Sequence, residues 1–326
     1  MKVSRRLNHN PPPMSGFLKR IALRLPGLGG LHRYIVALEA ERDQLRADLA
    51  HWKTWMSPGH FYSPIPSIDE IRAREAELFG TPPALLPGID LRAEEQVALV
   101  RELARFYPEM PFPRAQSAGT RYWFENWAYS YADAIFLYSM LRHLRPRRVI
   151  EVGSGFSSAA MLDTADRWLP ETTFTFIDPD TSTLDALLRP PDRQRVTILR
   201  ARLQDVPLET FDTLAANDVL FIDSTHVSKT GSDVNRIVFE ILPRLAAGVH
   251  IHFHDVFYPF EYPKEWVYEG RAWNENYILR AFLEFNDSFE IVLFGTWLGR
   301  FQRELLAELM PLTLENPGGS LWLRRK

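Results

Sequence analysis

The sequence contains no cysteine among its 326 residues. Disulfide bonds and thiolate metal sites are therefore excluded, and any bound metal must be held by histidine, carboxylate or carbonyl ligands. The absence of cysteine also favours a cytoplasmic location. No apolar run approaches the roughly 20 residues of a membrane span, and no apolar core of the signal-peptide kind opens the chain. We therefore expect neither secretion nor membrane insertion.

Acidic residues are absent from residues 1–34, although the whole chain carries a net charge of −3. Residues 1–60 hold ten Lys/Arg against four Asp/Glu, so the remainder is acidic and no nucleic-acid partner is indicated. We interpret residues 1–30 as a basic, flexible arm, because prolines 11–13 and the glycines within 27–30 disfavour regular structure. Within it, residues 17–25 form a basic amphipathic segment that suits peripheral contact with an anionic membrane surface.

A heptad pattern follows the arm and defines a segment at residues 31–56. Arg42 takes the one polar core position among the apolar residues Leu31, Ile35, Leu38, Leu45, Leu49 and Trp52. This spacing predicts a short coiled-coil-like helix. Because about three heptads give little independent stability, we interpret residues 31–53 either as a homo-oligomerisation element or as a helix docked on the main domain.

Residues 57–125 are predicted to form a helical cap. A capping box at Ser67 and Glu70 indicates a helix over residues 67–79, and Asp90 is expected to cap a helix that continues through Leu103. Prolines separate these segments. Asn126 then precedes an aromatic-rich stretch that predicts a helix over residues 127–142.

Short apolar runs alternate with helical patterns through the remainder of the chain. This alternation predicts an α/β fold over residues 126–326, with a doubly wound, Rossmann-like, seven-stranded sheet. We expect helices between successive strands, including one over residues 235–245. The predicted strands are residues 149–152, 174–177, 196–199, 219–222, 249–253, 289–294 and 320–323.

The carboxyl ends of these strands carry the candidate binding residues. The first strand ends at Glu151 and opens into a loop with Gly153 and Gly155, a pattern typical of nucleotide-like cofactor sites. Asp178, Asp223 and Asp255 end later strands. Doubly wound sheets bind ligands at this edge.

In their order, these features resemble the class I S-adenosylmethionine-dependent methyltransferases over roughly residues 120–326. Residues 151–155 look like the first motif of that family, Asp178 lies where its ribose-binding acid lies, and residues 318–323 are similar to its closing hairpin strand. Asp205 falls in the region where adenine contacts are usual. The resemblance implies S-adenosylmethionine as the cofactor, bound by Glu151, Gly153, Ser154, Gly155, Asp178 and Asp205.

Residues 223–226 and 254–255 resemble a narrower group, the metal-dependent O-methyltransferases of the macrocin type, within methyltransferase family 24. This resemblance implies that Asp223, His254 and Asp255 ligate Mg²⁺ or another divalent metal. His254 departs from the family pattern, which commonly has an acid or amide there, and its nitrogen suits Mn²⁺, Fe²⁺ or Zn²⁺ better than Mg²⁺. The structural alternative is that Asp223 caps its loop and Asp255 anchors Lys264 or Arg271.

We therefore expect an O-methyltransferase that uses S-adenosylmethionine and acts on a hydroxyl of a small molecule or glycan. His226 is the candidate general base and Lys229 the alternative. The aromatic residues within 257–277 suit a sugar acceptor, although they also suit simple packing. Three alternatives stay open: a nicotinamide enzyme, a metal-dependent hydroxylase similar to the cephalosporin hydroxylase family, and a non-catalytic assembly subunit.

Overall fold

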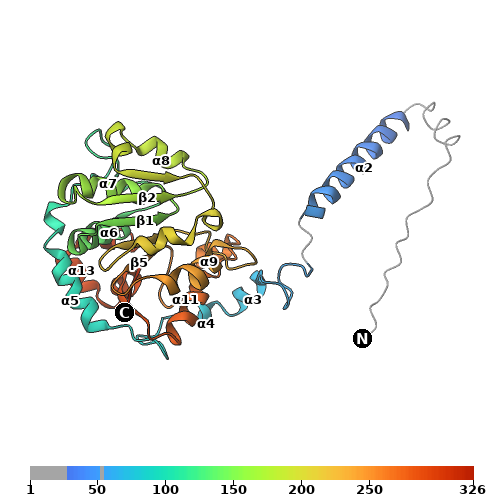
Figure 1. Cartoon of the computed structure of the whole chain (residues 1–326). Coiled ribbons are helices and arrows are strands. Elements are labelled where there is room, and N and C mark those ends of the chain that lie inside the picture. The colour runs from blue at the N-terminus through green and yellow to red at the C-terminus, as the bar shows by residue number, and fades with distance from the viewer. Residues whose placement is uncertain (1–27, 52–54) are drawn as a thin grey trace. The chain divides into compact units, whose positions relative to one another are not determined.

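The computed structural model describes residues 28–51 and 55–326 (Figure 1). The chain divides into two compact units, Met1–Ser67 and Ile68–Lys326. In the first unit, helix α2 (Leu28–His51) occupies most of the predicted heptad segment. The amphipathic segment at residues 17–25 lies outside the described residues. No helix in the described part of the chain is both long enough and apolar enough to cross a membrane.

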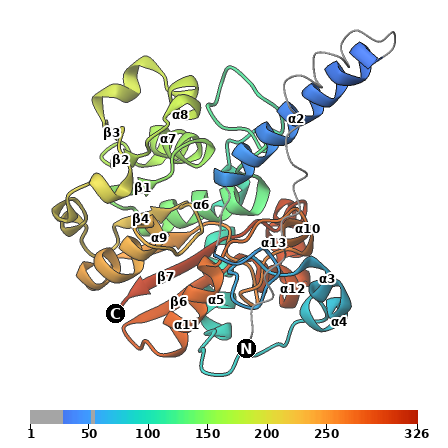
Figure 2. The same ribbon diagram turned by 90° about the vertical axis from the view of Figure 1, so that its right-hand side faces the viewer.

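A single seven-stranded sheet forms the centre of the second unit, in the order β3-β2-β1-β4-β5-β7-β6. Strands β1 to β5 run parallel, and β7 is antiparallel to both of its neighbours. In Figure 2 the labelled strands follow this order from β3 at the top through β2, β1, β4 and β7 to β6 at the bottom. The predicted sheet is confirmed, with strands β1 (Arg148–Val152), β2 (Thr173–Ile177), β3 (Val196–Leu199), β4 (Val219–Ile222), β5 (His250–Phe253), β6 (Phe289–Phe294) and β7 (Leu321–Arg325).

Continuous burial explains why the strands can be read from the sequence. Strands β4 and β5 are buried at every position, as expected for parallel strands covered on both faces. Strand β4 is accordingly an unbroken apolar run, whereas β5 contains two histidines. The ranges of β4 and of the partly buried strands β3 and β6 coincide with the predicted ones. Parallel pairing brings the carboxyl ends of β1, β2, β4 and β5 to one edge of the sheet, where the site lies.

Helices surround the sheet (Figure 1). The α-helices of the second unit are α3 (Ile68–Ala73), α4 (Glu75–Leu78), α5 (Ala93–Ala104), α6 (Tyr131–Leu144), α7 (Phe156–Trp168), α8 (Ser182–Leu187), α9 (Asp233–Arg236), α10 (Lys264–Tyr268), α11 (Glu275–Glu284), α12 (Gly295–Phe301) and α13 (Arg303–Leu309). Shorter 3₁₀ turns lie at Tyr107–Glu109, Pro190–Gln194, Leu203–Asp205, Leu208–Thr213, Leu242–Arg244 and Pro311–Leu314, and a π turn lies at Ile237–Ile241.

Two predicted helices before the sheet are wrong in extent. The helix expected over residues 67–79 is divided into α3 and α4 at Arg74. The helix expected from Trp127 begins only at Tyr131, because Asn126 organises a turn instead of capping the helix. The Asn126 side chain accepts hydrogen bonds from the backbone N–H groups of Ala128 and Tyr129.

Two predictions between strands also need correction, and proline is the common cause. No α-helix connects β3 and β4, where Pro207 lies between two 3₁₀ turns. The helix predicted over residues 235–245 is α9 followed by the π turn and a 3₁₀ turn. Pro243 has no N–H to continue the α-helical ladder, so the last turns adopt other geometries.

The segment predicted as a cap contacts the sheet domain through specific polar bonds. Fully buried Gln96 on α5 accepts a hydrogen bond from the backbone N–H of Phe294 on β6, at 2.7 Å. Glu75 on α4 accepts one from Lys264 on α10, also at 2.7 Å. Lys264 is thus paired with Glu75, and the predicted alternative of an Asp255–Lys264 anchor is wrong.

Candidate functional site

The loop after β1 depends on one glycine with a left-handed backbone. Gly153 has φ +80°, and a Cβ atom there would lie 2.1 Å from the carbonyl oxygen of Asp223. Only glycine permits this close approach of the β1 loop to the end of β4. The loop is held from its other side by Asp178, whose Oδ2 accepts a hydrogen bond from the Ser154 N–H at 2.8 Å.

Glu151 supports this loop from inside the protein. Its side chain is fully buried and accepts hydrogen bonds from the hydroxyl groups of Ser157 and Ser158 at the start of α7. Ser158 in turn accepts a hydrogen bond from the Gly155 N–H at 3.0 Å. Burial raises the pKa of Glu151 to about 8, against the opposing effect of the serine hydroxyls.

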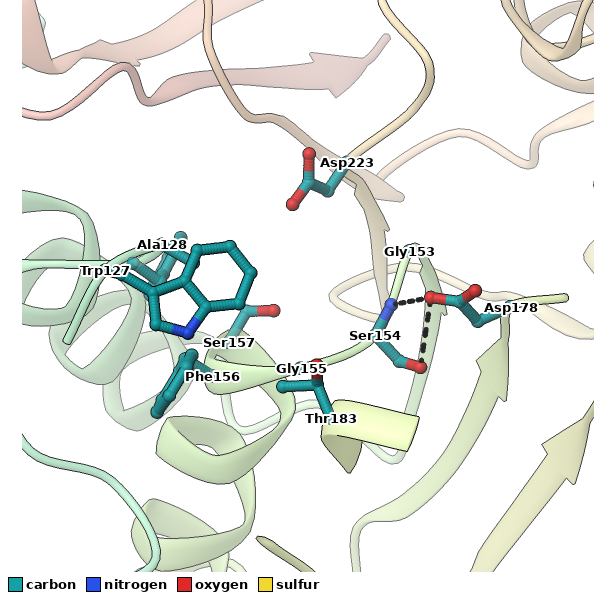
Figure 3. Close-up of a pocket in the computed structure, with 11 residues that line it drawn as sticks. Trp127, Ala128, Gly153, Ser154, Gly155, Phe156, Ser157, Asp178, Thr183 and Asp223 are labelled. Atoms are coloured by element: carbon teal, nitrogen blue, oxygen red, sulfur yellow. Dashed lines mark hydrogen bonds between the residues drawn. The ribbon is translucent and has the colours of Figure 1, made fainter. Parts of the chain in front are cut away.

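Two cavities lie at the carboxyl edge of the sheet and share Gly153, Asp178 and Asp223. In Figure 3 the carboxylate of Asp223 faces the first cavity, with Trp127 on one side and Ser154 on the other. This cavity has a volume of about 250 Å³ and is lined by Trp127, Ala128, Tyr129, Gly153, Ser154, Gly155, Phe156, Ser157, Asp178, Thr183 and Asp223. The second, of about 340 Å³, continues past Val152, Ile177, Pro179, Arg202, Leu203, Gln204, Ser224, Thr225 and Asp233.

Four of the six residues predicted to bind the cofactor line these cavities: Gly153, Ser154, Gly155 and Asp178. Glu151 is not in the lining, because it is buried behind the loop and contacts it through two serines. Asp205 is also outside the lining. Its carboxylate is about half exposed and pairs with Arg202 at 3.2 Å, while the neighbouring Gln204 lines the second cavity.

An acid–histidine cluster adjoins the same cavities. His226 Nε2 lies 3.4 Å from Asp223 Oδ1 and 3.6 Å from Asp255 Oδ2. One ligand atom from each of these three residues lies within 4.8 Å of the others. Because Asp223 also lines both cavities, the cluster and the cleft share one carboxylate.

His226 is held in place by a residue from a distant part of the chain. Its Nδ1 lies 2.9 Å from Oε2 of Glu275, which is buried at the start of α11, and the Trp273 ring packs on the imidazole at 4.4 Å. His226 itself has a left-handed backbone, with φ +59°. Burial alone would lower the pKa of His226, but hydrogen bonds with Asp223 and Glu275 outweigh it and raise the pKa to about 10.

His254 was predicted as the third metal ligand, whereas the three residues whose ligand atoms lie within 4.8 Å of one another are Asp223, His226 and Asp255. The His254 ring lies between Asp133 and Asp223, with Nε2 3.5 Å from Asp133 Oδ2 and Nδ1 3.5 Å from Asp223 Oδ1. Asp133 is buried on α6 and also accepts a hydrogen bond from the Gly319 N–H at 2.9 Å. Burial would lower the pKa of His254, but Asp255 and Asp223 raise it well above the ordinary value.

Lys229 and the aromatic segment occupy the loops beside the cluster. The Lys229 backbone N–H donates to Ser232 Oγ at 3.1 Å, next to the start of α9. Trp273 packs against Trp266 and Tyr262, with ring centroids 5.4 and 5.9 Å apart. Trp266 and Tyr262 therefore pack against the ring that contacts His226. Arg271 pairs with Glu269, so the predicted Asp255–Arg271 anchor is wrong as well.

Three site residues were missed from the sequence: Asp133, Glu275 and Trp127. Asp133 and Glu275 each lie in the first turn of a helix, where an acid is normally explained by the helix dipole. Trp127 was expected only to begin a helix, but it is 82% exposed and lines the first cavity. The available signal for Asp133 was that acids seldom occur within a strongly apolar helical stretch.

Replacing Glu151 with glutamine is expected to flatten the pH dependence of stability. The pKa of the Glu151 carboxyl is about 8 in the folded protein, against an ordinary value of 4.5. Between these two pH values the native state therefore keeps a proton that the unfolded state has released. The free energy of unfolding therefore falls as pH rises through this window, by at most about 1.4 kcal/mol per unit. Urea unfolding of the unmodified protein and of Glu151→Gln at pH 5, 6, 7 and 8 measures this free energy. An equal change of the free energy of unfolding with pH in the two proteins would contradict the prediction.

Residues 150–256 match a protein family described as "Methyltransferase domain". A curated relative, an "Uncharacterized protein" of Archaeoglobus fulgidus, is 34% identical over 173 residues, which are 49% of this chain and 74% of the relative.

Two solved structures are similar to the chain at low identity. CmcI with Mg and SAM is 19% identical over 68% of this chain and 84% of that chain, with a TM-score of 0.40. The second is the O-methyltransferase TomG from Streptomyces achromogenes, involved in tomaymycin synthesis and in complex with SAM. It is 16% identical over 70% of this chain and 89% of that chain, with a TM-score of 0.41. Scores of this size add nothing to the sequence match.

Proposed function

We propose that this chain, whose residues 150–256 match a methyltransferase domain family, transfers the methyl group of S-adenosylmethionine to a hydroxyl of a small molecule or glycan. One observation carries this proposal. Asp223 lines the cavities beside the glycine loop and also belongs to the acid–histidine cluster, so a donor and an acceptor would meet at this carboxylate. Alignment of two reactants is a large source of rate acceleration.

The glycine loop supplies the groups that a methyl donor needs. Backbone N–H groups at the start of α7, a 13-residue helix, suit the methionine carboxylate. Asp178 accepts the Asp180 N–H on Oδ1, and on Oδ2 it accepts the Ser154 N–H and, at 3.5 Å, the Ser154 hydroxyl. Oδ1 therefore keeps a lone pair for a ribose hydroxyl, and a second ribose hydroxyl would take the place of the Ser154 hydroxyl on Oδ2. Glu151 acts as a positioning residue behind them.

The cluster also fits a divalent metal. Asp223 and Asp255 offer oxygen, His226 offers Nε2, and Glu275 orients the imidazole through Nδ1, as carboxylates commonly do for metal-bound histidines. The mixed nitrogen and oxygen set favours Mn²⁺, Fe²⁺ or Zn²⁺ over Mg²⁺. When bound, such an ion would lower the pKa of an acceptor hydroxyl and orient it.

This arrangement changes the role first expected for His226. With its pKa raised to about 10, the imidazole is protonated at neutral pH and is a poor proton acceptor until another cation displaces that proton. We therefore propose His226 as a metal ligand first.

Affinity for Mn²⁺ is expected to rise with pH, because the metal must displace the His226 proton. Below the folded pKa of about 10, each unit of pH weakens this competition roughly tenfold, so the affinity should rise roughly tenfold per unit between about pH 6 and pH 8. Calorimetry in buffers of different ionisation enthalpy should show about one proton released per ion bound. The His226→Gln variant should lose this slope. An affinity that is independent of pH in the unmodified protein would contradict the assignment.

The activity is tested by incubating the protein with S-adenosylmethionine, Mn²⁺ or Mg²⁺, and a panel of phenols, alcohols and sugars. Formation of the demethylated donor together with a methylated acceptor supports the proposal. A second candidate is a metal-dependent hydroxylase, which the histidine nitrogen in the cluster favours. Oxygen consumption with an Fe²⁺-loaded protein, without use of the methyl donor, would select the hydroxylase instead.

A further inference from the structure

Helix α2 presents an apolar stripe that is exposed within the first unit. The helix has 24 residues, which corresponds to a length of about 36 Å. Ile35, Leu38 and Leu45 lie on one side of it, and 44%, 44% and 55% of their surfaces are exposed. Apolar side chains left exposed in such a row, which Arg42 interrupts, indicate a missing partner.

The spacing of the stripe identifies a partner of the same kind. Intervals of three and four residues place Ile35 and Arg42 at heptad positions a, and Leu38 and Leu45 at positions d. A β-branched residue at a with leucine at d is the combination that favours two parallel strands over three or four. Tyr34 and Val36 are exposed beside Ile35, so the apolar surface is wider at this end of the helix.

Charges beside the stripe are complementary between two copies of the helix. Glu41 occupies position g and Arg46 the following position e, and in a parallel pair the g residue of one helix faces that e residue of the other. Both side chains are exposed and free of a bond to each other within their own helix. A parallel dimer would contain two such Glu41–Arg46 pairs, one on each side of the apolar stripe.

Arg42 sets the register of such a pair. It lies at the central a position and is bound in its own helix only to the adjacent Asp43, at 2.8 Å among the described contacts. A basic residue at one a position lowers the stability of a coiled coil. It also selects the register in which the two copies of that residue lie opposite each other and can extend to the water-exposed flanks. Glu39 and Glu41 lie on both flanks and offset the two positive charges.

We propose that α2 pairs with α2 of a second copy of this chain as a parallel, in-register, two-stranded coiled coil. The proposal is independent of the reaction at the sheet edge. Docking of α2 on the second unit of its own chain is the competing arrangement.

The absence of cysteine makes the test direct, since a single introduced cysteine is then the only thiol. In the full-length protein, Leu38→Cys should form a disulfide-linked dimer under mild oxidation, because identical d positions face each other in a parallel pair. The matched control is Ala40→Cys, at position f on the opposite side of the helix, which should remain largely uncrosslinked. Equal crosslinking of the two variants, or none in Leu38→Cys, would overturn the parallel pair.

Sedimentation provides a second readout that does not depend on a thiol. The full-length protein should show a concentration-dependent dimer, and Arg42→Leu should tighten it at least about tenfold by removing the buried charge. Glu41→Arg should weaken the dimer, and combining it with Arg46→Glu should restore it. A monomer at all concentrations for both the unmodified protein and Arg42→Leu would overturn the proposal in favour of docking within one chain.

Discussion

Replacing Asp223 with asparagine is expected to lower kcat/KM for methyl transfer by about 10²- to 10⁴-fold. The change keeps the shape of the side chain but removes the charge that faces His226 at 3.4 Å and His254 at 3.5 Å. A metal acting as a Lewis acid is worth several kcal/mol, and each 1.36 kcal/mol is about tenfold in rate. Donor binding should change much less, because the glycine loop and Asp178 are untouched.

The measurement is steady-state kinetics with and without added Mn²⁺, together with calorimetry of the metal. Asp69→Asn is the matched control, since the Asp69 side chain is 95% exposed on α3 and should leave both quantities unchanged. The two histidines that face Asp223 also lower the pKa of its carboxyl, although burial opposes them, so the group is ionised at neutral pH. Full activity of Asp223→Asn in the presence of a chelator would remove this carboxylate from the mechanism.

Replacing Arg121 with leucine is expected to lower the free energy of unfolding by about 3–5 kcal/mol. The buried guanidinium donates to Asp163 at 2.7 Å and to Asp192 at 2.8 Å, and both acids are themselves buried. Without Arg121, two carboxylates stay in the interior without their countercharge. Urea unfolding followed by tryptophan fluorescence measures the change.

Arg200→Leu is a suitable control for this substitution, because Arg200 pairs with Asp185 at the surface and such pairs contribute little. Neutralising the acids together with the arginine, in Arg121→Leu/Asp163→Asn/Asp192→Asn, should recover part of the loss. The account of Arg121 would be wrong if its single variant lost less than about 1 kcal/mol.

The strands and their end residues could be predicted because each depends on a short local pattern. Residues 219–222 are an apolar run followed by an acid, and parallel pairing with β5 brings Asp223 and Asp255 to one edge. The expectation for Gly153 also holds, since its φ of +80° excludes a side chain. Local sequence therefore identified the β1 loop and named all three cluster residues, Asp223 and Asp255 as candidate metal ligands and His226 as the candidate general base.

The remaining parts of the site arise from contacts between distant segments. Glu275 is 49 residues from His226 in the sequence, and no spacing rule connects them. Asp133 reaches His254 only because α6 packs beside the carboxyl edge of the sheet. His254 was therefore placed in the metal set by its position next to Asp255, while the left-handed backbone at His226, φ +59°, brought that residue into the cluster instead.

The central claim is that the cleft at Gly153, Asp178 and Asp223 binds a methyl donor, and isothermal calorimetry with S-adenosylmethionine and its demethylated product tests it most directly. The account predicts one site per chain for both ligands, and loss of binding in Gly153→Ala, whose added Cβ would lie 2.1 Å from the Asp223 carbonyl oxygen. Circular dichroism of the variant would verify that it remains folded. Absence of binding of both ligands to the folded, unmodified protein would contradict the account.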